Sequence, residues 1–76
     1  MTKLFRWMRK HFIKEAIRRL QKDGEYKFSN LSREESRKAA TELAKAVMED
    51  DSENGIDSEF GITRDAFGYY SAVQIF

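Results

Sequence analysis

LSREESRKAATELAKAV, residues 31–47, predicts a helix that begins at Ser32 and continues through Val47. Ser32 is followed three residues later by Glu35, which is the spacing of a capping box. In that arrangement the Ser32 hydroxyl accepts from the N–H of Glu35, and the Glu35 carboxylate accepts from the N–H of Ser32. Apolar positions then recur at steps of three and four residues, at Ala40, Leu43, Ala44 and Val47. Because this stripe is narrow and built of small residues, we expect the helix to lie close against a sheet.

The preceding segment, from Thr2 to Lys22, predicts a second amphipathic helix. Nothing in it breaks a helix, and its apolar residues follow the helical repeat: Phe5, Met8, Phe12, Ile13, Ala16, Ile17 and Leu20. Gly24 stands where a residue with positive φ would end the helix. We expect one arc of this helix to face the core, formed by Phe5, Met8, Phe12, Ala16 and Leu20.

Three segments have the apolar patterns of short strands. They run from Glu25 to Asn30, from Glu59 to Thr63 and from Phe67 to Phe76, and residues 64–66 join the last two as a hairpin. The C-terminal segment is apolar on both faces, with Phe67, Tyr69, Val73 and Ile75 on one and Tyr70, Ala72 and Phe76 on the other. We therefore expect it to lie centrally in the sheet, or to be covered by a second copy of the chain in a homodimer.

Together these elements predict a single α+β domain over residues 1–76, with a short antiparallel sheet packed against helices. The order is helix, strand, helix, strand, strand, divided into a basic amphipathic helix over residues 1–23 and a strand-helix-hairpin portion over residues 24–76. A length of 76 residues leaves room for one domain. The chain has no cysteine and one histidine, so we expect no disulfide, metal or cofactor to support the core.

The composition of the chain predicts its subcellular location. Absence of cysteine fits a reducing compartment, and no segment approaches the roughly 20 apolar residues that span a bilayer. Glu15 and several basic residues interrupt the apolar residues near the N-terminus, whereas a secretory signal has an uninterrupted apolar region. We expect a cytoplasmic protein.

Charge is unevenly distributed, although the net charge is only +1. Residues 1–22 contain eight bases and a single acid, Glu15, whereas the remaining 54 residues contain six bases and twelve acids. Opposite the predicted core arc of the first helix, a basic-aromatic face gathers Lys3, Trp7, Lys10, His11, Lys14 and Arg18. We expect this face to be a binding surface. Trp7 would stack against a nucleic-acid base or insert into a pocket of a partner, while the cations contact phosphates or carboxylates. Alternatively, Trp7 folds over the lysine stems or against the C-terminal strand.

After Met48 the chain becomes acidic and rich in turn-forming residues. Its carboxylates are Glu49, Asp50, Asp51, Glu53, Asp57 and Glu59. Acids at a helix C-terminus oppose the helix dipole, so the sequence offers no local folding reason for them. They predict either a solvated loop or a surface for a cationic partner, including partial mimicry of nucleic-acid phosphates. A calcium loop is not expected, because Gly61 stands where an EF-hand requires a bidentate glutamate.

Catalytic motifs are missing from the sequence. His11 is the only histidine, its neighbours Arg9 and Lys10 offer no acceptor to orient it, and no glycine-rich phosphate loop occurs. We therefore expect a non-enzymatic module that docks on a protein or nucleoprotein complex and modulates or inhibits it, similar in character to accessory proteins of mobile elements. The alternative is nucleic-acid binding through the first helix. Membrane binding is disfavoured, because the apolar arc of that helix is needed for the core.

Overall fold

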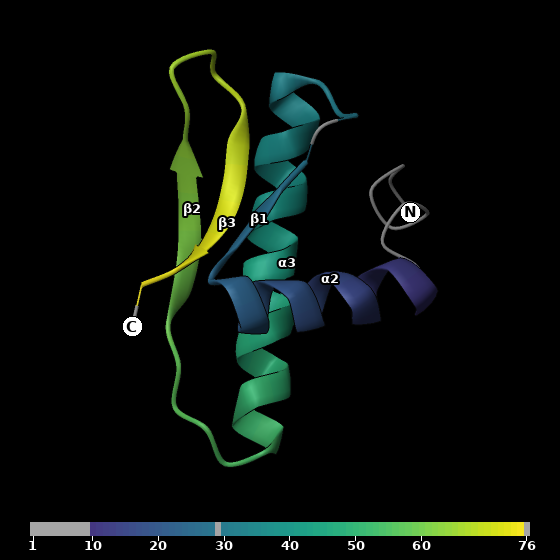
Figure 1. Ribbon diagram of the computed structural model, residues 1–76, viewed down its shortest axis with the longest axis vertical. Helices are drawn as coiled ribbons and strands as arrows, with labels where there is room; N and C mark the ends of the chain where they lie inside the picture. The colour runs from purple at the N-terminus through teal and green to yellow at the C-terminus, as the bar shows by residue number, and fades with distance from the viewer. Residues whose placement is uncertain (1–9, 29, 76) are drawn as a thin grey trace.

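The structure is a computed structural model, and it describes residues 10–28 and 30–75 (Figure 1). These residues form two helices and a three-stranded antiparallel sheet, together with the segments that connect them. The elements are α2 (Lys10–Asp23), β1 (Glu25–Lys27), α3 (Arg33–Glu53), β2 (Phe60–Arg64) and β3 (Tyr70–Gln74). Their order confirms the predicted α+β fold. The predicted helical residues before Lys10, including the core positions Phe5 and Met8, lie outside the described residues, as does the side chain of Phe12.

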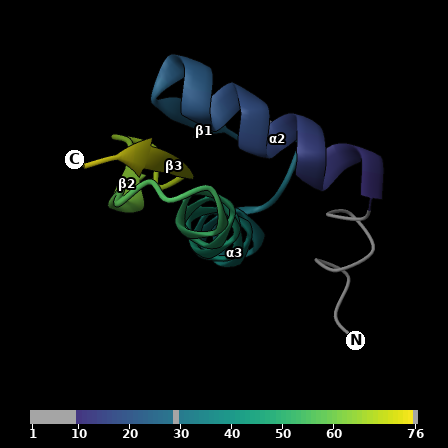
Figure 2. The same cartoon turned by 90° about the horizontal axis from the view of Figure 1, so that it is seen from below.

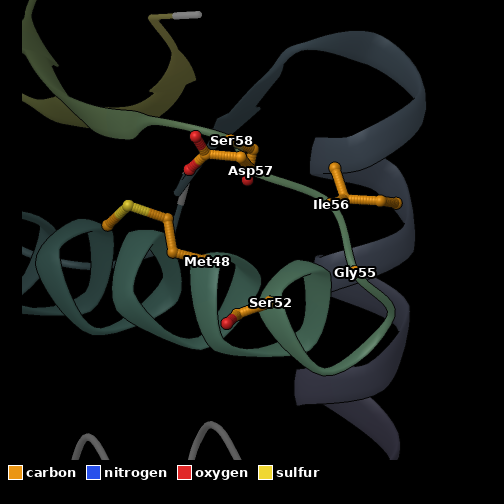
Figure 3. A pocket seen from close by; sticks show the side chains of 6 residues that line it. All are labelled: Met48, Ser52, Gly55, Ile56, Asp57 and Ser58. Carbon is orange, nitrogen blue, oxygen red and sulfur yellow. The ribbon is translucent and has the colours of Figure 1, made fainter.

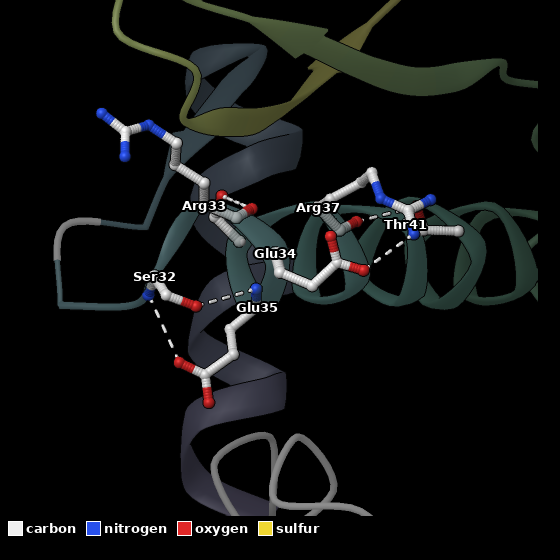
Figure 4. Close-up of polar contacts among 7 residues, drawn as sticks. Ser32, Arg33, Glu34, Glu35, Arg37 and Thr41 are labelled. Carbon is white, nitrogen blue, oxygen red and sulfur yellow. Dashed lines mark hydrogen bonds and ion pairs between the residues drawn. The ribbon is translucent and has the colours of Figure 1, made fainter.

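Helix α3 begins with the predicted capping box. The Glu35 N–H donates to the Ser32 hydroxyl at 3.2 Å, and the Ser32 N–H donates to the Glu35 carboxylate at 3.3 Å (Figure 4). The side of the helix that is buried carries Ser36, Ala39, Ala40, Leu43, Ala44, Val47 and Asp51. The helix continues to Glu53, so the expectation of a loop from Glu49 onward is wrong as far as Glu53. The N–H of Asn54 caps the end of the helix by donating to the carbonyls of Asp50 and Asp51.

The strand order in the sheet is β1-β3-β2, which places the C-terminal strand at the centre. Tyr26 of β1 and Ile62 of β2 both pair with Ala72 of β3. The first of the two alternatives for this strand is therefore confirmed. Both edges of β3 are therefore paired within one chain.

β3 is shorter than predicted because Asp65 builds a turn across residues 65–69. Its carboxylate accepts from the N–H groups of Phe67 and Tyr69, at 2.9 and 3.0 Å. Gly68 adopts a φ of 92°, which strongly favours glycine. Phe67 and Tyr69 consequently belong to the turn, and the prediction that they lie in the strand is wrong. β1 is likewise limited to Glu25–Lys27.

The core lies between α3, α2 and one face of the sheet. Figure 2 shows α3 end-on, with the sheet on one side and α2 lying across it. Leu20 of α2 and Leu43 and Val47 of α3 are fully buried. Ala40 and Ala72 are also fully buried, and such small side chains permit the close approach of α3 to β3. Within the described residues, no helix is long and apolar enough to cross a membrane.

Candidate functional site

Helix α2 presents cations on the side opposite its buried residues. Ala16 and Leu20 are buried, as predicted, whereas Lys14, Arg18 and Lys22 are exposed at steps of four residues. At 100° per residue these three cations share one side of the helix, which we call the basic face of α2. Of the predicted basic-aromatic face, Lys3 and Trp7 lie outside the described residues, and so do the side chains of Lys10 and His11.

The basic face of α2 is not neutralised by the rest of the described chain. Two ion pairs are present in the described part, and both connect neighbours on one helix: Glu15 with Arg19 at 3.8 Å and Glu34 with Arg37 at 3.1 Å. Neither involves Lys14, Arg18 or Lys22. Such exposed pairs contribute little to stability. Among the described side chains, no ion pair joins the basic N-terminal segment to the acidic segment after Met48.

The acidic segment divides into a buried part and an exposed part. Asp51 is only 6% exposed, and its carboxylate accepts from Gln21 Nε2 at 2.8 Å and from the Ser58 hydroxyl. Asp50 is half-buried and accepts from the same Gln21 amide at 3.0 Å. These contacts connect α2, α3 and the segment before β2, so Asp51 has a folding role that the sequence did not reveal. The exposed carboxylates are Glu49, Glu53, Asp57 and Glu59.

A shallow depression of about 360 Å³ lies between the C-terminal part of α3 and residues 55–58 (Figure 3). Its lining consists of Met48, Ser52, Gly55, Ile56, Asp57 and Ser58. Nucleophilic catalysis by a serine requires a base beside the hydroxyl. The lining contains no histidine or lysine, and the Ser58 hydroxyl donates to Asp51.

The N-terminus of α3 holds the β2–β3 turn in place. Arg33 Nε donates to the Phe67 carbonyl at 2.6 Å, and the Arg33 guanidinium lies 5.1 Å from the centre of the Tyr69 ring. The buried Ser36 hydroxyl donates to the Arg33 carbonyl at 2.7 Å and accepts from the N–H of Tyr70 at 3.0 Å. Phe67 remains 74% exposed on this fixed turn. Asp65 followed by Gly68 was the local signal for the turn, but nothing in the sequence indicated its contact with α3.

Among the described residues, histidine, aspartate and glutamate side chains do not gather in groups of three that would hold a metal ion. No protein-family model matches the chain, and neither a curated protein nor a solved structure matches it.

Proposed function

We propose that this chain is a small, non-enzymatic binding module that docks on a protein or nucleoprotein complex and modulates or inhibits it. The proposed contact surface is the basic face of α2, and the proposed location is the cytoplasm, on the compositional grounds given above. The observation that carries the proposal is the set of three exposed cations, Lys14, Arg18 and Lys22, which make no ion pair with a described residue.

Rigidity of the helix supports this assignment. Ala16 and Leu20 fix α2 in the core, and the Gln21 amide ties its last turn to Asp50 and Asp51. The cations are therefore presented on a backbone that is held in place before a partner arrives, which lowers the entropic cost of binding. An anionic surface on the partner would be attracted over several ångströms, and this attraction raises the association rate.

Charge reversal on α2 tests the proposal. The tagged chain and the variant Lys14→Glu/Arg18→Glu are used to capture proteins from nuclease-treated extracts of the source cells. A matched control, Lys38→Glu/Lys45→Glu, makes the same change in charge at exposed positions of α3. We expect the partner to be retained by the parent and the control and to be lost by the α2 variant. Equal capture by all three proteins would contradict the proposal.

A second candidate function is direct nucleic-acid binding through the same face. The four-residue spacing of Lys14, Arg18 and Lys22 favours it, because it aligns the cations along one side of the helix where they can contact successive phosphates. Fluorescence anisotropy with labelled DNA and RNA over a salt series tests this function. We expect each removed phosphate contact to reduce the slope of log K against log salt by about 1. Binding that is independent of salt would contradict it.

The exposed carboxylates offer a third way to test the surface assignment. The variant Glu49→Lys/Glu53→Lys changes exposed side chains, whereas reversal of Asp51 would disrupt the folding contacts of a buried carboxylate. If the captured partner docks through the acidic segment instead, this variant should slow its association. Unchanged association with the Glu49→Lys/Glu53→Lys variant, together with loss of binding by Lys14→Glu/Arg18→Glu, would assign the interface to α2.

A further inference from the structure

The two edges of the sheet differ in how they are protected. β1 has three residues, two of which are the exposed charged residues Glu25 and Lys27, and α2 packs against it. β2 has five residues, and no described strand pairs with its outer edge. Ile62, at its centre, is 38% exposed, and the chain contains no proline that would block the edge. An edge of this kind is a template for pairing with another strand.

The direction of the backbone groups along β2 can be derived from the bonds at its two ends. The N–H of Ile75 donates to the Glu59 carbonyl at 2.8 Å, and the N–H of Asp65 donates to the Tyr69 carbonyl at 2.9 Å. In an antiparallel ladder such positions alternate, so Gly61 and Thr63 also direct their backbone groups to β3. The N–H and C=O groups of Phe60, Ile62 and Arg64 then point away from β3.

We propose that the outer edge of β2 binds the β2 strand of a second copy of the chain, antiparallel and about a two-fold axis at Ile62. In this register Ile62 faces Ile62 of the second copy, and Phe60 faces its Arg64. Each outward-pointing N–H meets a carbonyl, because residues opposite each other at such positions exchange both bonds. The exposed Ile62 side chains cover one another, and the stem of Arg64 lies on the same face of the sheet as the Phe60 ring opposite it.

The net charge of the chain is small enough to permit a second copy. The chain has a net charge of +1, so two copies repel one another only weakly. Just beyond the strand ends, the same register brings Glu59 toward Asp65 of the second copy, and this contact of like charges weakens the dimer. Added salt should therefore strengthen it by screening. The residues of β2 lie outside the basic face of α2, so dimerisation through β2 and binding through α2 can be tested separately.

Amide exchange provides the test that is specific to this edge. The full chain is studied by sedimentation equilibrium and by hydrogen exchange measured with NMR at low and high concentration. We expect a monomer–dimer equilibrium, with slower exchange at Phe60, Ile62 and Arg64 as the dimer forms. The amides of Gly61 and Thr63 should be protected at both concentrations, because they donate to β3. A dimer without this alternating gain in protection would contradict the proposal, and so would a monomer at concentrations up to about 1 mM.

Two lysine variants distinguish the effect of a charge placed at the proposed dimer contact from the effect of an added charge elsewhere on β2. Ile62→Lys places like charges on the two-fold axis and should weaken dimerisation by at least about tenfold. Thr63→Lys adds the same charge at an exposed neighbouring position whose side chain lies on the opposite face, so dimerisation should persist. A thermal melt of each variant verifies that it is folded. Equal dimerisation of the Ile62→Lys variant and the parent would overturn the assignment.

Discussion

The basic face of α2 and the acidic segment after Met48 look alike in the sequence, as two runs of like charge. In the structure they differ in burial and in hydrogen bonding. Lys14, Arg18 and Lys22 are all exposed, whereas Asp51 is buried and receives hydrogen bonds from Gln21 and Ser58. A buried carboxylate is tolerated when its oxygens are hydrogen-bonded. The difference teaches that a run of like charges can combine a structural group with surface groups, and that only the three-dimensional contacts separate them.

The largest effect should come from removing the buried member of the acidic segment. Asp51→Ala removes the acceptor of the Ser58 hydroxyl and one of the two acceptors of the Gln21 amide, so the free energy of unfolding should fall by about 3 kcal/mol. Glu53→Ala is the matched control at an exposed position, and it should change stability by no more than about 0.5 kcal/mol. Urea denaturation measures both values. If the two variants lose equal stability, the division of the acidic segment is wrong.

A smaller effect is expected from the partner of that carboxylate on α2. Gln21→Ala should lower the free energy of unfolding by about 1 to 2 kcal/mol, because the amide donates to both Asp50 and Asp51. Lys22→Ala, the exposed neighbour, should leave it nearly unchanged. A double-mutant cycle of Gln21→Ala with Asp51→Ala should show a coupling of about 1 kcal/mol, since both changes remove the same contact. Strict additivity would show that the two side chains do not interact in solution.

Local features of the fold could be predicted from the sequence. The capping box at Ser32 and Glu35 depends on residues three apart, and the burial of Ala16 and Leu20 follows from helical periodicity. The central place of β3 was predicted from the many apolar residues of the C-terminal segment, although Phe67 and Tyr69 lie in the turn before the strand. In each case the physical cause lies within a single element.

Contacts between distant elements could not be predicted. Gln21 and Asp51 are 30 residues apart, and Arg33 and Phe67 are 34 residues apart. Hydrogen bonds of this kind depend on how the helices are placed against the sheet, and one sequence contains no periodic signal for them. The extension of α3 to Glu53 was missed for a related reason. The dipole argues against acids there, but Asp51 is stabilised by groups from other elements.

The smallest effect on stability should come from the basic face itself. Lys14→Glu/Arg18→Glu changes exposed side chains that make no ion pair with a described residue, so its free energy of unfolding should stay within about 0.5 kcal/mol of the parent. Retention on heparin should nevertheless fall, because polyanion binding depends on those cations. Combining this variant with Glu49→Lys/Glu53→Lys should give additive stabilities to within about 0.5 kcal/mol. A combined variant that regains stability lost in the separate ones would show that the two charged regions neutralise each other across the fold. In that case the basic face would be a structural element, and the difference between the two regions would disappear.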